Sequence, residues 1–210
     1  LTIENGSALA GDLSRVHTLA EQGVRAITLT WNGENELGSG HTTDHGMSEF
    51  GKAAVREMEK ENILVDVSHL NDPGFADLLE VATKPFVATH SNARALCSHK
   101  RNLTDDMLRA LADKGGVTGL NFSADFLVDD AHYTHVADLV RHARHIADVA
   151  GVETVALGSD FDGIGCELEF KDCAGMPMIE EGLSKAFTAR EVDLITHGNA
   201  LRVMKDNFGA

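Results

Sequence analysis

Two histidines stand where apolar, β-branched runs of the sequence end. His69 follows the run at residues 63–68, and His90 follows the run at residues 85–89. Imidazole nitrogens are common zinc ligands, and a carboxylate can complete or bridge such a site. A single histidine at a strand end is more often a hydrogen-bonded core residue. Two of them on neighbouring strands, with Glu4 as the carboxylate, favour a zinc site made of Glu4, His69 and His90.

A third apolar run, residues 154–159, ends on Asp160. Its place on the last predicted strand, far along the chain from Glu4, suits a general acid or base better than a metal ligand. The alternative is a carboxylate that caps a turn, which fits Asp162, next to Gly163, better. We therefore predict that Asp160 handles protons in a reaction.

The elements that must hold these residues alternate between strand and helix. The patterns predict strands at residues 25–31, 63–69, 85–91, 116–122 and 154–160, and helices at residues 48–62, 71–83, 104–115, 134–151 and 188–208. Such alternation implies a parallel sheet, either doubly wound or closed into a (β/α) barrel. Polar residues end strand after strand and no glycine-rich phosphate loop follows the first strand, so we predict the barrel.

Composition bounds the class of protein. A chain of 210 residues suffices for one sizeable domain, which we place at residues 1–210, and no segment has the apolar length of a membrane span. The net charge of −15 argues against a nucleic-acid partner. Three cysteines without CxxC spacing argue against a disulfide framework and favour a reducing compartment, so we expect a cytoplasmic protein.

Two further histidines, His142 and His145, lie three residues apart on the predicted helix 134–151. This spacing could in principle bind a metal ion. Both positions fall on the polar face of the helix, so we expect them at a solvated surface.

Several stretches together resemble the renal, or membrane, dipeptidase family of zinc peptidases, which has bacterial members. The matching stretches are IENG (3–6), RAITLTWNGENELGSG (25–40), MSEFGKAAVREMEKENILVDVSHL (47–70), PFVATHSNARALCSHKRNLTDDMLRAL (85–111) and VALGSDFDG (155–163). The resemblance implies a (β/α)8 TIM-like barrel of the metal-dependent hydrolase type with two zinc ions. It also implies hydrolysis of small dipeptides by a metal-activated water.

The resemblance implies roles for the metal and proton-handling residues. Glu4 matches the carboxylate that bridges the two zinc ions of the family. His69 and His90 match the ligands of the second zinc. Asp160 matches the aspartate that serves the bridging water and then the leaving amine.

Three residues match positions that bind substrate in the family. Arg101 matches the arginine that holds the terminal carboxylate of the substrate, a task that suits a planar bidentate donor. Phe126 and Gly163 stand where the family contacts substrate.

The chain departs from the family pattern in two places. The first zinc of the family also takes a His-x-Asp pair from the opening strand, and only three residues precede Glu4 here. We therefore expect a barrel from its third strand onward, with two zinc ions in a complete site or one in this chain. The family's carbonyl-polarising histidine falls on Trp31, whose indole N–H can donate one hydrogen bond. His41 or His45 in the following loop could take over that role.

These departures leave alternatives open. The missing strands imply a longer natural chain, which we favour, or a separate polypeptide that supplies them, or a truncated gene. The alternative function is a catalytically silent zinc- or ligand-binding barrel domain that lacks the first metal site. A metal-dependent amidase or deaminase is a third reading, against which Arg101 argues. A homodimer is also left open.

Overall fold

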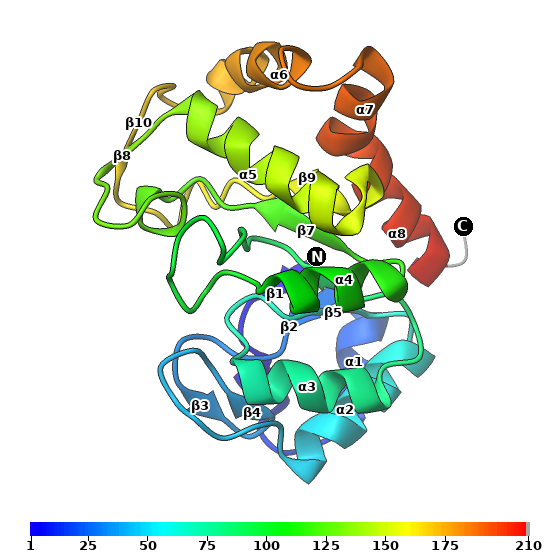
Figure 1. Cartoon of the computed structure of the whole chain (residues 1–210). Helices are drawn as coiled ribbons and strands as arrows, with labels where there is room; N and C mark the ends of the chain where they lie inside the picture. The colour runs from blue at the N-terminus through cyan, green and yellow to red at the C-terminus, as the bar shows by residue number, and fades with distance from the viewer. Residues whose placement is uncertain (209–210) are drawn as a thin grey trace. The chain divides into compact units, whose positions relative to one another are not determined.

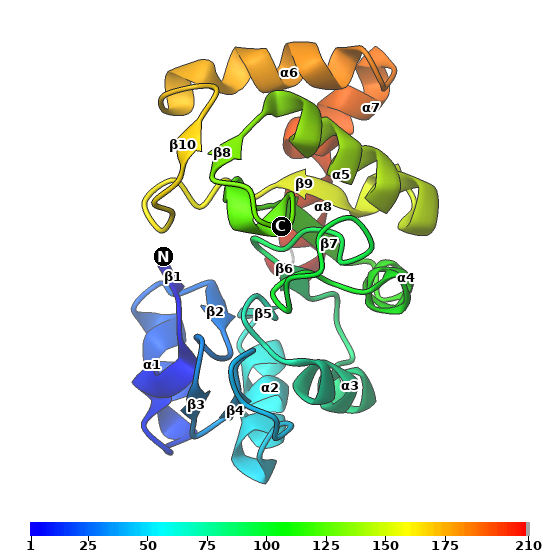
Figure 2. The same cartoon turned by 60° about the vertical axis from the view of Figure 1, so that its left-hand side comes forward.

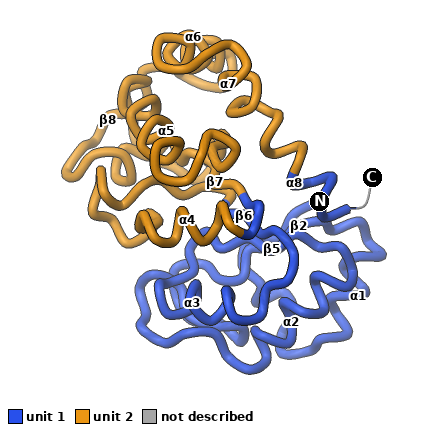
Figure 3. Tube along the Cα trace, turned by 45° about the vertical axis from the view of Figure 1, so that its right-hand side comes forward, with its two compact units in different colours: residues 1–88, 114–116, 203–210 blue, residues 89–113, 117–202 orange. Residues whose placement is uncertain are grey.

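The computed structural model describes residues 1–208, which form two compact units (Figure 3). Unit 1 comprises residues 1–88, 114–116 and 203–208, and unit 2 comprises residues 89–113 and 117–202. The single barrel domain expected over residues 1–210 stays a prediction. No helix of residues 1–208 is long and apolar enough to cross a membrane.

Unit 1 is built on a parallel sheet. Its strands lie in the order β1 (Thr2–Ile3), β2 (Ala26–Thr28), β5 (Leu64–Asp66) and β6 (Val87–Ala88). Every residue of β2, β5 and β6 is buried. Parallel strands covered on both faces have such near-continuous apolar sequences, as the pattern predicted.

Three helices of unit 1 pack in a row, α1 (Ser14–Glu21), α2 (Glu49–Lys60) and α3 (Asp72–Val81). Figures 1 and 2 show α2 between its two neighbours. Helix α2 begins at Ser48, whose side chain accepts a hydrogen bond from the Gly51 N–H. Its residues Ala54, Val55 and Met58 recur on one helical face and are fully buried, which is why α2 packs on β5.

A short antiparallel hairpin follows β2, made of β3 (Glu34–Asn35) and β4 (Gly38–Ser39) (Figure 2). The side-chain oxygen of Asn35 accepts the N–H groups of Leu37 and Gly38, and so closes the turn. The sequence predicted only a loop in this region.

Unit 2 combines a parallel strand pair with helices. Its strands are β7 (Val117–Leu120) beside β9 (Val155–Leu157), and β8 (Tyr133–Thr134) beside β10 (Glu167–Leu168). Its helices are α4 (Asp105–Asp113), α5 (Val136–Ala150), α6 (Met176–Ser184) and α7 (Ala189–Asp193), followed by a π-helical turn (Leu194–Gly198). Helix α5 packs against α4, α6, β7 and β9 (Figure 1). Helix α8 (Asn199–Phe208) contributes residues to both units.

The strands are shorter than the apolar runs predicted. The run at residues 63–69 yields β5, and the run at 154–160 yields β9. The residue at the end of each predicted strand, His69 (φ 73°) or Asp160 (φ 65°), adopts the left-handed backbone and so lies outside the strand. That conformation ends an extended strand and is uncommon for residues other than glycine.

Candidate metal-binding and substrate-binding residues

Glu4 and His69 form a pair in unit 1, which we call the metal-ligand pair. Glu4 directly follows β1, and His69 follows β5 in the same parallel sheet. His69 Nε2 lies 3.0 Å from Glu4 Oε1. The His69 side chain is 10% exposed and that of Glu4 is 52% exposed, so a largely buried imidazole ring faces a solvent-accessible carboxylate.

Asn32 sets the orientation of the His69 ring. Its Oδ1 lies 2.9 Å from His69 Nδ1. An amide oxygen only accepts hydrogen bonds, so Nδ1 donates to Asn32 and Nε2 is the ring nitrogen that faces Glu4. At 3.0 Å from the Glu4 carboxylate, Nε2 either carries a second ring proton or shares a cation with the carboxylate. The imidazole nitrogen and the carboxylate oxygens are ligand atoms of a kind that could hold a metal ion.

The loop after β2 brings Trp31 and His41 near His69. The ring centroids of Trp31 and His41 lie 6.1 Å and 6.3 Å from that of His69. His45 differs, because its side chain is 87% exposed and its Nδ1 lies 2.6 Å from Glu34. The hydrogen bond to this carboxylate raises the pKa of His45. His41 and His45 were the two candidates for the role of the histidine that Trp31 replaces, and of these it is His41 that lies beside His69.

The backbone on both sides of His41 is fixed. Gly40 has no room for a side chain, since a Cβ there would lie 1.8 Å from the carbonyl oxygen of Trp31. On the other side, the Thr42 N–H donates to the carbonyl of Asn32 at 3.0 Å. Asn32 thus contacts the His69 ring through its side chain and holds the segment that carries His41 through its carbonyl.

His90, the third predicted ligand, belongs to unit 2 and is buried. Its Nδ1 lies 2.8 Å from the Thr89 hydroxyl. The next residue, Ser91, donates its N–H to the carbonyl of Gly119 in β7 at 2.9 Å. A Cβ on Gly119 would lie 2.1 Å from the Thr89 carbonyl, so glycine permits this close approach.

Arg101 and Phe126 come together in unit 2. The guanidinium carbon of Arg101 lies 5.3 Å from the centroid of the Phe126 ring, and Arg101 is buried. The His99 ring packs on the same phenyl ring at 4.6 Å. Burial, together with the Arg101 charge, lowers the pKa of His99, so its ring is neutral at pH 7. An aromatic face thus supports the planar cation that the sequence predicted for carboxylate binding.

Asp160 and Gly163 share one turn after β9. The Gly163 N–H donates to the Asp160 carbonyl at 2.9 Å. A Cβ on Gly163 would lie 2.2 Å from Asp160 Oδ1, so glycine makes room for the carboxylate. The Asn121 amide donates to Asp160 Oδ2 at 2.9 Å. The contact of Gly163 with substrate stays a prediction.

Three buried asparagines, Asn92, Asn102 and Asn121, form a hydrogen-bonded set that we call the asparagine network; each is 0% exposed. The Asn92 amide donates to the carbonyls of Asn121 (2.9 Å) and Phe126 (3.1 Å). The Asn102 amide donates to the carbonyls of Phe126 and Cys97, both at 2.9 Å. The sequence patterns assigned a role to none of the three.

The expectation that His142 lies at a solvated surface is wrong. His142 is fully buried, with its Nδ1 accepting the Ala93 N–H at 3.1 Å and its Nε2–H donating to the Leu127 carbonyl at 2.8 Å. Burial lowers the pKa of His142 to about 4, so the ring is neutral at pH 7. Distant backbone groups cover this face of α5, a contact that helical periodicity does not report. His145 is part-buried, 2.8 Å from Asp105.

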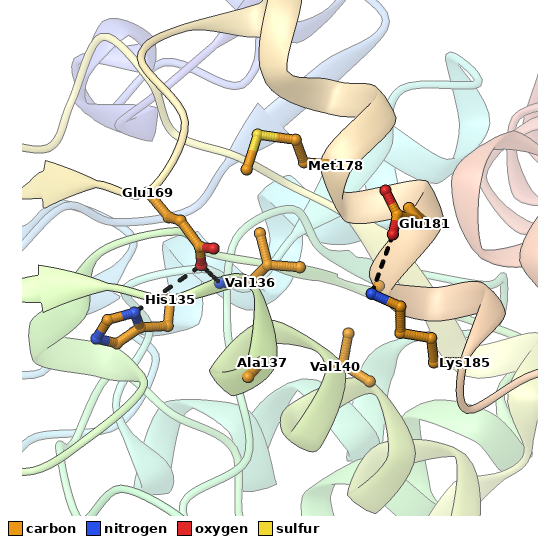
Figure 4. Close-up of a pocket in the computed structure, with 9 residues that line it drawn as sticks. His135, Val136, Ala137, Val140, Glu169, Met178, Glu181 and Lys185 are labelled. Atoms are coloured by element: carbon orange, nitrogen blue, oxygen red, sulfur yellow. Dashed lines mark hydrogen bonds and ion pairs between the residues drawn. The ribbon is translucent and has the colours of Figure 1, made fainter.

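A cavity of about 570 Å³ lies in unit 2 (Figure 4). It is lined by His135, Val136, Ala137, Val140, Glu169, Met178, Glu181, Gly182 and Lys185. Among its charged residues, Lys185 lies 3.1 Å from Glu181, and the Glu169 carboxylate accepts a hydrogen bond from the Val136 N–H. Among these lining residues none is a predicted site residue. The cavity therefore does not mark the candidate site.

A parallel α/β fold with imidazole and carboxylate donors at strand ends defines a metal-dependent hydrolase of the TIM-barrel type, which confirms the predicted fold class. Residues 1–208 match the membrane dipeptidase family, peptidase family M19. The chain belongs to this family, and it is a hydrolase of the metallo-dipeptidase type.

Relatives with full coverage of the chain support the assignment. An uncharacterized protein in the pqqA 5′ region of Klebsiella pneumoniae is 38% identical over 216 residues, which cover 97% of this chain and 80% of that protein. A metallopeptidase from Rhodobacter sphaeroides, solved with a phosphinate mimic of the dipeptide L-Ala-D-Ala, is 30% identical with a TM-score of 0.94 over 99% of this chain and 62% of that chain. Dipeptidase AC of family M19 is 30% identical with a TM-score of 0.94, over 100% of this chain and 65% of that chain. The chain thus spans less than two thirds of these two solved chains.

Proposed function

We propose that this chain hydrolyses small dipeptides with a zinc-activated water, and that Glu4, His69 and His90 bind the zinc. The observation that supports this most is the metal-ligand pair, in which an imidazole nitrogen and a carboxylate oxygen, both atoms that can bind zinc, lie 3.0 Å apart. Each of the three side chains offers a ligand atom of a type that zinc prefers. Bound zinc would lower the pKa of a water molecule and polarise the peptide carbonyl.

The number of zinc ions per chain is the first quantity to measure, by elemental analysis of the folded protein. About two ions would mean that ligands beyond these three complete the site. About one ion would mean that the three predicted ligands act alone. A folded chain that binds no zinc when it is supplied would contradict the proposal.

Arg101 is proposed to hold the terminal carboxylate of the dipeptide. A guanidinium donates two parallel hydrogen bonds to a carboxylate, and the Phe126 ring at 5.3 Å supports its plane. The Rhodobacter sphaeroides metallopeptidase binds a mimic of L-Ala-D-Ala, a dipeptide whose second residue is a D-amino acid. We propose that this chain also accepts a D-residue at that end.

Two further side chains complete the proposal. Asp160 carries a proton between the water and the leaving amine. The ring of His41, near His69, supplies an N–H to the substrate carbonyl, a role for which Trp31 offers only its indole N–H.

The test of the function is hydrolysis of Gly-D-Ala, with and without a chelator. Turnover that stops with the chelator and returns with zinc supports the proposal. Zinc that raises the melting temperature without turnover would support the silent binding domain instead.

A pair of Arg101 variants tests the carboxylate role. Arg101→Lys keeps the charge but loses the bidentate geometry, and Arg101→Ala loses both. We expect KM for Gly-D-Ala to rise in both, more in Arg101→Ala. An unchanged KM in Arg101→Ala would remove Arg101 from substrate binding.

His41→Ala and His45→Ala form a matched pair in one loop. We expect His41→Ala to lower kcat strongly. His45→Ala loses only an exposed ion pair to Glu34, so its kcat should stay within about twofold. Equal kcat in both variants would exclude His41 from catalysis.

A homodimer and a cytoplasmic location are kept as predictions. The three cysteines, Cys97, Cys166 and Cys173, are all free, which agrees with a reducing compartment.

A further inference from the structure

We propose that Asn121 is a positioning residue that fixes the Asp160 carboxylate for proton transfer. This inference rests on the proposed function, in which Asp160 handles the proton. It adds a residue whose contribution is exerted only through Asp160.

The two side chains meet because their strands are neighbours. In the β7–β9 pair Leu120 lies opposite Leu157, so Asn121 and Asp160 both follow strand ends on the same edge. Asn121 Nδ2 donates to Asp160 Oδ2 at 2.9 Å across a sequence separation of 39 residues.

The amide of Asn121 can face Asp160 in only one way. Its Oδ1 accepts the Ser123 N–H at 2.7 Å, so the oxygen end of the amide is already used by a donor. The nitrogen end must then face Asp160, as the hydrogen bond requires. The orientation is set by a backbone group and does not depend on Asp160 itself.

Asn121 is also anchored through its own backbone. Its N–H donates to Asn92 Oδ1 at 2.9 Å, and its carbonyl accepts the Asn92 amide at 2.9 Å. Asn92 in turn donates its N–H to Asn102 Oδ1 at 3.2 Å. Because all three asparagines are 0% exposed, water does not compete for these bonds. The donor that meets Asp160 is therefore held rigidly.

Asp160 needs such a partner. Its left-handed backbone (φ 65°) is uncommon for a non-glycine residue, and strained residues persist where their surroundings over-determine them. Oδ2 accepts from Asn121, whereas Oδ1 accepts no hydrogen bond from the residues that the structure describes. We therefore assign proton transfer to Oδ1. A neutral amide fixes the carboxylate without adding a charge that would compete for the proton.

The experiment is a double-mutant cycle on the zinc-loaded full chain with Gly-D-Ala as substrate. We expect Asp160→Asn to lower kcat by about 10³-fold, the range of a lost proton-transfer group. We expect Asn121→Ala to lower kcat by about 10²-fold, as a misplaced group does, with KM and zinc content within about threefold of the parent. The double variant should match Asp160→Asn alone, because Asn121 acts only through Asp160.

A second variant and a control guard against simple unfolding. Asn121→Asp keeps an oxygen for the Ser123 N–H and replaces the donor to Asp160, so it should also lose kcat. Asn102→Ala perturbs the same network next to Phe126 and should raise KM more than it lowers kcat.

The outcomes separate the inference from the proposed function. If Asp160→Asn keeps its kcat, the role of Asp160 is wrong and the inference fails with it. If Asp160→Asn is inactive but folded Asn121 variants keep kcat within about twofold, only the inference fails. Fully additive losses in the double variant would also overturn the inference, because they would show a structural effect.

Discussion

The metal-ligand pair of unit 1 and the asparagine network of unit 2 hold functional side chains in opposite ways. Glu4 is half exposed, and the amide of Asn32 lies 2.9 Å from the His69 ring. In the network, the amides of Asn92 and Asn102 each make two hydrogen bonds to backbone carbonyls.

The first arrangement needs a bound ion or proton to be stable, whereas the second is already in place before anything binds. The His69 nitrogen and the Glu4 carboxylate, 3.0 Å apart, are held together by a proton or a cation between them, so the pair depends on what it binds. The network is satisfied within the protein, so its geometry exists before any ligand arrives. Variants in unit 1 should therefore change metal affinity, and variants in the network should change stability and orientation.

The largest expected effect is on His69→Ala. Removal of a ligand should reduce zinc affinity by more than the roughly 10- to 100-fold that loss of an outer partner costs. Zinc per chain and Gly-D-Ala hydrolysis should fall together, while the melting temperature without metal changes little. Full zinc retention would show that the pair is not a metal site.

Asn102→Ala should lower the free energy of unfolding by about 3 kcal/mol. The buried Cys97 carbonyl loses the Asn102 amide as its donor, and the Phe126 carbonyl loses one of its two amide donors. Denaturant unfolding measures this change. Asn35→Ala, in the unit 1 hairpin, serves as a part-buried comparison. A loss below about 1 kcal/mol for Asn102→Ala would contradict the preorganised network.

Acid should weaken unit 2 through His142. Its pKa is about 4 in the folded protein against 6.5 as the ordinary value, so between these values the unfolded chain binds a proton that the folded chain does not. The stability that His142 contributes is therefore complete above pH 6.5 and is lost as pH falls toward 4, by about 3 kcal/mol.

Denaturant unfolding at a series of pH values from 7 to 4 tests this pH dependence of the unfolding free energy. The variant His142→Gln lacks the titrating imidazole and should show a smaller decrease in stability with acid. His17 in unit 1 should change stability with pH in the opposite direction, because its hydrogen bond to Glu61 raises the pKa of His17. Its contribution is present below pH 6.5 and is lost as pH rises. Equal slopes in His142→Gln and the parent would contradict the role of His142.

The smallest expected effect is on Asn32→Ala. Loss of the oriented Nδ1 partner should weaken zinc binding by about 10- to 100-fold with little change in the unfolding free energy of the metal-free chain. Competition with a zinc indicator measures the affinity. Asn32→Asp is the matched variant, since it keeps an acceptor for Nδ1 and should retain most of the affinity. Equal affinities of Asn32→Ala and the parent would remove Asn32 from the site.

Part of this architecture could be predicted from local pattern. The predicted helix 104–115 corresponds to α4, where the Met107 N–H donates to the Thr104 hydroxyl at 3.2 Å, a capping role that suits threonine. Helices α1 and α6 were not predicted. In α1 only Val16 is buried, so no apolar stripe marks it. Helix α6 follows an irregular segment and has a proline in its first turn, with only Ile179 and Leu183 buried.

The sequence by itself determined the alternation of strands and helices, the family, and the polar residues that end the strands. Those features are encoded locally, in periodicity and in motifs. Only the tertiary structure decided that Asn32 orients His69, that His41 and not His45 lies beside it, and that Asn121 holds Asp160. The physical reason is distance along the chain. The His69–Asn32 and Asn121–Asp160 hydrogen bonds join residues 37 and 39 positions apart, and no local sequence pattern specifies which distant group an amide will contact.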